Sequence, residues 1–199
     1  MTEGALKEIE LVWLGPFTWF GKGGESIFAG PGREVPGVYV WTVPVGGSQR
    51  VFYVGQTQAG LAHRHHDHFR EYFGGAYSIY EPSAFRRGSL EKLYHGYAYK
   101  KPRWQRATPF HERFPDLVRP LVEHLEVMRI YITRLDASAR VQRRVESALM
   151  QVVYNIPGEA GQLLEPGLRR HPRRDDEEPI HVFLKPVGLL EGVSDQFAA

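Results

Sequence analysis

The sequence predicts an α+β fold in which a small central antiparallel sheet of about three strands is flanked by α-helices. Two β-branched and aromatic runs, 37–43 and 51–55, are separated by a turn-forming segment. A third run, 126–133, alternates well, and two further segments repeat apolar residues every three or four positions. With 199 residues, 42% of them apolar, the chain is long enough to bury a core. We therefore expect a single domain over 1–199.

Composition excludes several classes of protein. The chain has no cysteine, which excludes a disulfide framework and a thiolate zinc site. The N-terminus lacks the pattern of a secretory signal, and no apolar run approaches the roughly 18–20 residues that span a bilayer. We expect a soluble, cytoplasmic protein with no membrane partner.

The middle of the chain is basic although the net charge is only +2. Between residues 62 and 113 there are ten Lys or Arg and five Asp or Glu. Such a stretch favours a polyanionic partner, and the alternative is a solvated face.

The N-terminal third predicts a hairpin. Residues 5–14 suit a short helix or a strand, and 15–32, rich in Gly and aromatic residues, indicate a loop. The two runs pair as antiparallel strands around a turn at 44–49. Because side chains alternate along a strand, Tyr39 points with Trp41 to one face, opposite to Val38 and its alternate neighbours. Tyr53 lies on the second strand.

A helix follows the hairpin directly. Its apolar and aromatic positions recur at helical spacing, and Gly74-Gly75 ends it. Arg64 and His68 are four residues apart and must share a face. Of the four histidines between 63 and 68, three point in different directions, so joint metal ligation is disfavoured.

The second half of the chain is less regular at first. Short helices are expected at 89–94 and 117–124, the latter interrupted by Pro120. After the strand at 126–133, Asp136 or Ser138 can cap the next helix.

This last helix carries an apolar stripe, with Glu146 beside it and Arg143 and Arg144 facing outward or toward a partner. It ends near Asn155. Residues 180–184 suit an edge strand.

Seven positions of this pattern, in this order, resemble the GIY-YIG nuclease superfamily: Tyr39, Tyr53, Gly55, Arg64, His68, Glu146 and Asn155. The two tripeptides read Gly-Val-Tyr and Tyr-Val-Gly, so the middle residue departs mildly in each. The resemblance covers a core of about 36–73 and 127–156. It implies an insertion at about 74–126, similar to those that grip DNA in restriction-type members, and a C-terminal extension at 157–199.

The resemblance implies a metal-dependent phosphodiesterase. The lone helix carboxylate, Glu146, would hold one Mg²⁺ or Mn²⁺ ion. Arg64 would donate hydrogen bonds to phosphate oxygens. Either Tyr39 or His68 would be the general base, and the sequence leaves this choice open. Tyr53 would complete the hydrogen-bond shell, and Asn155 would fix the site's geometry.

The substrate expected from the resemblance is double-stranded DNA. Aromatic residues and cations interleave between 97 and 106, where four cations are candidates for phosphate contacts: Lys100, Lys101, Arg103 and Arg106. Specific cutting of both strands favours a homodimer of restriction or defence type. A nicking or repair nuclease, an RNA-directed nuclease and a catalytically silent binding domain remain alternatives.

Overall fold

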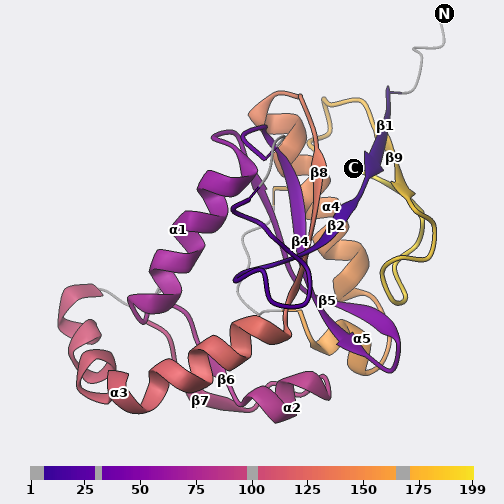
Figure 1. The fold of residues 1–199 in the computed structure, drawn as a ribbon. Helices are drawn as coiled ribbons and strands as arrows, with labels where there is room; N and C mark the ends of the chain where they lie inside the picture. Colours follow the sequence, from indigo (N-terminus) through magenta and orange to yellow (C-terminus); the bar gives the residue numbers. More distant parts are fainter. Residues whose placement is uncertain (1–6, 30–32, 98–102, 165–170) are drawn as a thin grey trace, which may run out of the picture.

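The structure is a computed structural model that describes residues 7–29, 33–97, 103–164 and 171–199, without the side chains of 103–106. Helices and strands are mixed, and the described strands form three sheets (Figure 1). The largest sheet has five strands in the order β3-β2-β8-β4-β5. These are β2 Leu14–Thr18, β3 Glu25–Ser26, β4 Gly37–Val45, β5 Ser48–Thr57 and β8 Arg129–Arg134. The predicted antiparallel sheet is its β8-β4-β5 portion, which β2 and β3 extend.

Helices pack over both faces of this sheet (Figure 1). Helices α1 (Leu61–Phe73) and α3 (Arg103–Val127) share a core with Tyr39 and Trp41 of β4. Helix α4 (Ala139–Tyr154) shares the opposite core with Val38 and its alternate neighbours. The alternation predicted for β4 is confirmed.

The hairpin forms as predicted, with longer strands. Two glycines at positive φ, Gly46 (58°) and Gly47 (86°), make the turn between β4 and β5. Tyr39 pairs with Gly55 across the strands, and Trp41 pairs with Tyr53. This register brings the Tyr-bearing segments of both strands together at one face.

The N-terminal and C-terminal strands form a second sheet that the sequence did not predict. Its order is β1-β9-β10, with β1 (Lys7–Val12) parallel to β9 (Ile180–Lys185) and β10 (Gln196–Ala198) antiparallel to it. The edge strand expected at 180–184 is therefore the central strand here. The loop expected at 15–32 is wrong in part, because β2 and β3 lie within it.

The insertion is more ordered than predicted. Strands β6 (Ile79–Tyr80) and β7 (Lys92–Tyr94) pair, and the short helix α2 (Pro82–Arg86) lies between them. The helix expected at 89–94 is wrong, since β7 occupies its end.

Helix α3 is one helix of 25 residues and contains Pro109, Pro115 and Pro120. An internal proline costs roughly 3 kcal/mol, which is why the sequence predicted only a fragment. Burial offsets this cost along one apolar stripe: Phe110, Leu117, Leu121 and Leu125. Because α3 continues to Val127, strand β8 begins at Arg129 and not at Glu126.

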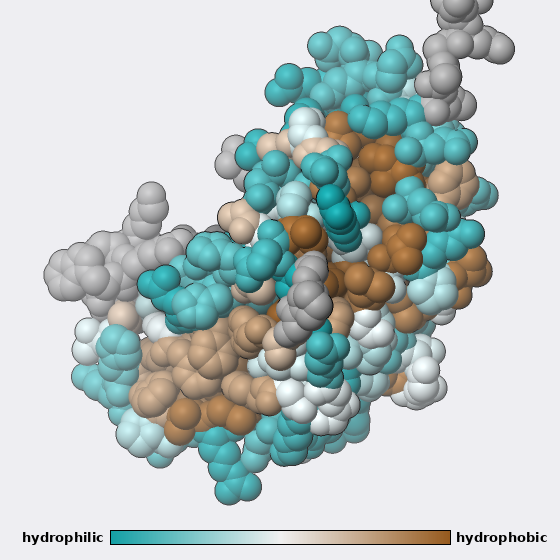
Figure 2. All heavy atoms as spheres, turned by 45° about the horizontal axis from the view of Figure 1, so that its top comes forward, coloured by the Kyte–Doolittle hydropathy of each residue, from teal (hydrophilic) through white to brown (hydrophobic). Residues whose placement is uncertain are grey.

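The surface mixes hydrophilic and hydrophobic areas on the face shown in Figure 2. The exposed large apolar side chains of the described residues include Val12, Leu14, Phe20 and Phe28. None of the described helices is both long and apolar enough to cross a bilayer.

Candidate functional site

Tyr39 and His68 form the centre of the candidate site. Both side chains are fully buried, and Oη of Tyr39 lies 2.6 Å from Nε2 of His68. Strand β4 supplies the phenol, and α1 supplies the imidazole. The first two N–H groups of α1 donate to backbone carbonyls of Arg33 and Val35, which fixes the start of the helix against the segment leading into β4.

Gly55 makes room for Tyr39. A Cβ at this position would collide with Oη and Cζ of Tyr39. The ring of Tyr39 therefore lies against the backbone of β5, where only glycine leaves space for it.

Substitution of Gly55 by alanine should displace the Tyr39 ring from His68. We expect a loss of roughly 1–3 kcal/mol in the free energy of unfolding, as for other overpacked sites. Urea denaturation measures this loss. Gly24→Ala is the control, because its Cβ would make only ordinary contacts. Equal effects of the two substitutions would show that Gly55 has no special packing role.

Arg64 and the two tyrosines are electrostatically coupled. Burial raises the pKa of Tyr39 to about 12, although the charge of Arg64 and its hydrogen bond to the phenol offset part of this effect. Burial likewise raises the pKa of Tyr53 well above its usual value, and its ring stacks on Trp41 at 4.5 Å. Both phenols are therefore neutral hydrogen-bonding groups at physiological pH.

Glu146 reaches the site from the opposite side of the sheet. It lies on α4, which Ser138 caps as predicted by accepting a hydrogen bond from the N–H of Val141. Its half-buried carboxylate accepts a hydrogen bond from the backbone N–H of Gln56 on the edge strand β5. Burial raises the pKa of Glu146 to about 7 despite that bond and the nearby charges of Arg64 and Arg143.

The remaining histidines of α1 have other roles. His65 is buried, donates from Nδ1 to the carbonyl of Leu61 (2.7 Å) and accepts at Nε2 from Trp41 (3.1 Å). Both nitrogens are thus occupied, and burial lowers its pKa to about 4. His65 is buried while His63 and His66 are exposed, so these rings point in different directions, as their helical positions predicted.

Tyr77 is a member of the cluster that the sequence interpretation missed. Its hydroxyl lies 3.0 Å from Nδ1 of His68, so His68 is held between two phenols. Tyr77 follows α1 in a segment without helical or strand periodicity, and therefore no spacing rule pointed to it. The only feature that could have pointed to Tyr77 is its position between Gly75 and β6.

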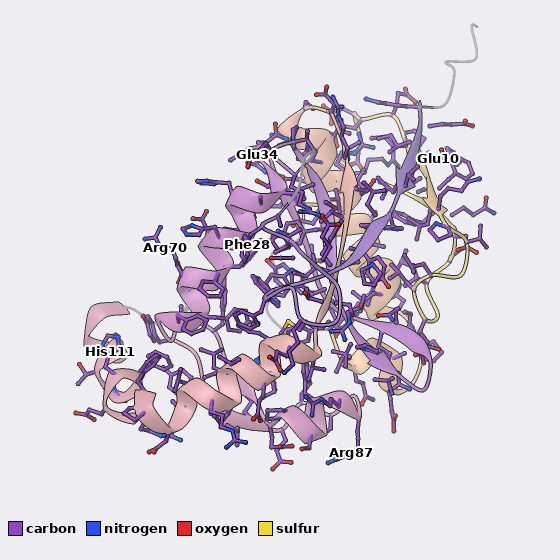
Figure 3. The ribbon with its side chains drawn as sticks, viewed as in Figure 1. Glu10, Phe28, Glu34, Arg70, Arg87 and His111 are labelled. Carbon is purple, nitrogen blue, oxygen red and sulfur yellow. The ribbon has the colours of Figure 1, made fainter. Side chains whose placement is uncertain are left out.

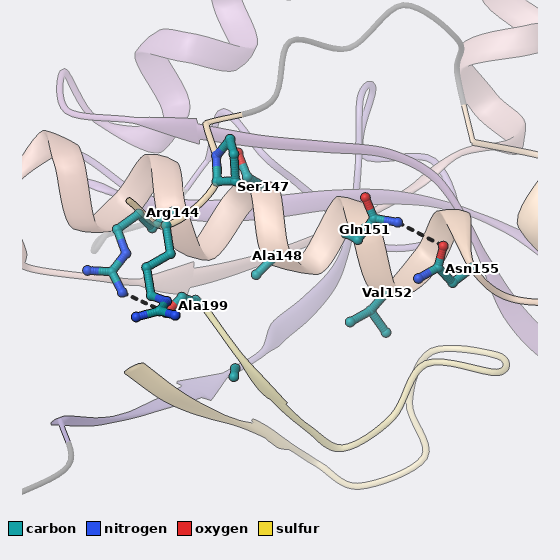
Figure 4. Close-up of a pocket in the computed structure, with 10 residues that line it drawn as sticks. Arg144, Ser147, Ala148, Gln151, Val152, Asn155 and Ala199 are labelled. Atoms are coloured by element: carbon teal, nitrogen blue, oxygen red, sulfur yellow. Dashed lines mark hydrogen bonds between the residues drawn. The ribbon is translucent and has the colours of Figure 1, made fainter. Parts of the chain in front are cut away.

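Asn155 does not join the cluster. It is the exposed C-terminal cap of α4, and its Oδ1 accepts a hydrogen bond from Gln151 (2.8 Å; Figure 4). Both residues line a pocket of about 280 Å³. Nine residues of helix place Asn155 about 13 Å beyond Glu146 along the axis. The expected role of Asn155 in fixing the site's geometry is therefore not supported.

Arg144 corrects another expectation. It does not face outward: its side chain is buried and donates to the carbonyls of Glu178 (2.6 Å) and Ala199 (2.7 Å; Figure 4). Arg144 thus links the C-terminal segment to α4 through hydrogen bonds, whereas its neighbour Arg143 is exposed.

The predicted phosphate contacts lie where the structure gives no side-chain positions. Lys100 and Lys101 are outside the described residues, and Arg103 and Arg106 lie within α3 but without described side chains. Their proposed role stays a prediction.

The donor set suits a hard divalent cation held by one carboxylate. Within the described ranges, no three His, Cys, Asp or Glu side chains gather as a metal cage. Mg²⁺ commonly uses one or two carboxylates, with water and substrate phosphates as the other ligands. Glu146 fits this use because its half-buried carboxyl has a raised pKa, so a cation would favour its ionised form.

Comparison with known proteins adds no relative. No model of a protein family matches the chain, and neither the curated proteins nor the solved structures contain a match. The functional interpretation therefore depends on the geometry of the described residues and on the resemblance of their order to a known pattern.

Proposed function

We propose that this chain is a metal-dependent endonuclease of the GIY-YIG type that hydrolyses phosphodiester bonds in DNA. One arrangement carries the proposal: Tyr39 hydrogen-bonds His68 and stacks with Tyr53. Arg64 and Glu146, from helices on opposite faces of the sheet, act electrostatically on both phenols. A cation, a carboxylate and two phenols in one place are suited to an anionic substrate that reacts with water.

Arg64 is the phosphate-binding group in this proposal. It is half-buried, its guanidinium stays charged, and it can donate to two nonbridging oxygens at once. In this position it would bind the scissile phosphate and neutralise charge that develops in the transition state. The hydrogen bond between Arg64 and Tyr39 would bring the phosphate beside the phenol.

Tyr39 and His68 are the groups that orient the attacking water and remove its proton. At neutral pH neither is charged, because burial raises the pKa of Tyr39 and lowers that of His68. They therefore act as hydrogen-bonding groups that pass a proton on, rather than as a stored phenolate or imidazolium. Tyr53 contributes a second hydroxyl on the same face.

Glu146 would hold the metal ion, which would supply Lewis-acid stabilisation of the phosphate and of the leaving oxygen. The backbone N–H of Gln56 donates to this carboxylate and fixes its orientation.

The substrate class can be tested by incubating the purified protein with plasmid DNA, genomic DNA and RNA in Mg²⁺ or Mn²⁺ and sequencing the ends. We expect double-stranded DNA to be cut at discrete sites, by a homodimer of restriction or defence type. Scattered ends, nicks or RNA cleavage would assign a different nuclease. No cleavage of any substrate would favour a domain that only binds nucleic acid or protein.

Neutralisation of the basic stretch should weaken DNA binding. We expect substitution of Lys100, Lys101, Arg103 and Arg106 by glutamine to reduce the slope of log affinity against log salt by about 0.9 for each phosphate contact that is lost. Fluorescence anisotropy over a salt series measures the slope. An unchanged slope would place the DNA elsewhere on the surface.

A further inference from the structure

His68 has a hydrogen-bonding partner on each ring nitrogen, and this restricts where its proton lies. Neutral imidazole carries one N–H donor and one acceptor. Burial and the charge of Arg64 lower the pKa of His68 well below its usual value, so the ring is neutral. One of its two tyrosine partners must therefore donate to the ring and the other must accept from it.

The contact lengths select the direction. A distance of 2.6 Å between Tyr39 Oη and Nε2 suits an O–H donor, whereas 3.0 Å between Nδ1 and Tyr77 Oη suits an N–H donor. Arg64 has only donors, and the hydrogen bond from Tyr53 lowers the pKa of Tyr39, as a donor to the phenol does. The phenol oxygen thus accepts from Arg64 and Tyr53, and its own proton is free to point at Nε2. These contacts assign Tyr39 as the donor to Nε2 and Nδ1–H as the donor to Tyr77 in the resting site.

Tyr77 is the member of this chain of hydrogen bonds that lies nearest to solvent. Tyr39 and His68 are both fully buried, whereas Tyr77 is half-buried. A proton that reaches Tyr77 is thus closer to solvent than one on either buried group.

We infer that Tyr39, His68 and Tyr77 form a proton relay. Tyr77 is a positioning residue in this relay and releases one proton to solvent for each proton that the attacking water loses. This inference rests on the proposed phosphodiesterase function, which supplies the water and the phosphate. It gives Tyr39 and His68 a shared task and makes neither one the sole base.

The relay is balanced in protons and charge. An O–H bond of the water breaks as its oxygen attacks phosphorus, and that proton forms a new O–H bond on Tyr39. The P–O bond to the leaving oxygen breaks, and this oxygen takes a proton from solvent. The former Tyr39 proton passes to Nε2, the Nδ1 proton passes to Tyr77, and the former Tyr77 proton leaves to solvent. Each side chain remains neutral, so no buried imidazolium or phenolate is formed. His68 ends with its proton on Nε2, and proton exchange with solvent restores Nδ1–H before the next turnover.

The surroundings of His68 support a neutral relay. These groups face it from the elements packed around it: Arg64 and His65 on α1, Tyr39 on β4, Tyr53 on β5, and Tyr77. The charge of Arg64 disfavours a second positive charge on the ring.

Nitrogen-15 NMR of the imidazole in the full-length protein tests the hydrogen bonding without any substrate. We expect the Nδ1–H tautomer of His68 in the wild type. In Tyr77→Phe the Nδ1 proton loses its acceptor, and we expect a shift to the Nε2–H tautomer. Tyr131→Phe, in the opposite core, should leave the tautomer unchanged. An Nε2–H tautomer in the wild type, or no change in Tyr77→Phe, would overturn the relay.

Single-turnover cleavage of DNA tests whether the relay takes part in catalysis. Tyr77→Phe should slow cleavage by about 10- to 100-fold, at the low end of proton-transfer contributions, and should reduce the solvent deuterium isotope effect. Tyr131→Phe should match the wild type. Cleavage by Tyr77→Phe at the wild-type rate would overturn the relay. Absence of cleavage by the wild type itself would instead refute the proposed function, and the NMR result would still decide the hydrogen-bond direction.

Discussion

Glu146→Gln is expected to slow DNA cleavage on the order of 10³-fold, the effect of removing one major electrostatic contributor. The amide preserves the shape of the side chain and its acceptor for the Gln56 N–H, but it cannot ionise to hold a cation. Single-turnover cleavage in Mg²⁺ measures the loss. Glu123→Gln is a matched control, because its exposed ion pair with Arg119 on α3 contributes little. Wild-type cleavage by Glu146→Gln would remove this carboxylate from the mechanism.

The raised pKa of Glu146 also predicts a dependence on pH and metal together. With its pKa at about 7, the carboxyl is protonated below that pH and ionised above it. Metal binding requires the ionised form, so cleavage at low metal concentration should rise through about pH 7. Higher metal concentration should move this midpoint to lower pH. A midpoint independent of metal concentration would contradict the assignment.

Mild acid is expected to unfold the protein. Burial lowers the pKa of His65 to about 4 and that of His124 to about 3, and that of His68 shifts in the same direction. In the unfolded chain these groups bind protons below their ordinary value near 6.5. Because the unfolded state then binds more protons, stability is lost as pH falls below about 6.5.

Glu146 acts in the opposite direction, because its raised pKa makes the folded state bind a proton between pH 7 and 4.5. Three histidines against one carboxyl leave a net loss of about 2.7 kcal/mol per pH unit near pH 5.5. Against a stability of about 5 kcal/mol, the low end of the typical range, this predicts unfolding near pH 4–5. Urea denaturation between pH 7.5 and 5 measures the slope, and a flat profile would contradict the burial of these rings.

Substitution of His124 separates the contribution of one buried histidine to the pH dependence of stability. Its ring lies among Phe85, Tyr80 and Tyr72, and neither nitrogen has a hydrogen-bond partner among the described residues. His124→Leu should reduce the pH slope by about 1.4 kcal/mol per unit and raise stability at neutral pH by about 1–3 kcal/mol. The exposed His66→Ala should change neither quantity.

Local patterns predicted the centre of the fold well. The hairpin and α1 follow from β-branched runs, a Gly-rich turn and helical spacing, and the shared face of Arg64 and His68 follows from their separation. The second sheet could not be predicted this way, because β1 and its parallel partner β9 are about 170 residues apart. No local signal specifies such a pairing.

The site was predicted in part for similar reasons. Glu146 came from the resemblance, and the structure brings it to the edge of β5. Tyr77 lies in an irregular segment whose position depends on α1 and β6. The helical pattern predicted Arg144 to face outward or toward a partner. The backbone carbonyls that it binds belong to the C-terminal segment, so its burial depends on tertiary contacts. Asn155 matched the expected order but lies too far along α4.

Plasmid cleavage by Arg64→Ala tests most directly whether the cluster is one phosphodiesterase site. Arg70 provides the control, because it lies on the same helix but is exposed and projects away from the molecule (Figure 3). The wild type and Arg70→Ala should cut DNA in Mg²⁺ and stop on addition of EDTA. Arg64→Ala should bind duplex DNA without cutting it. Cutting by Arg64→Ala at the wild-type rate, or cutting by the wild type that EDTA does not stop, would contradict the assignment.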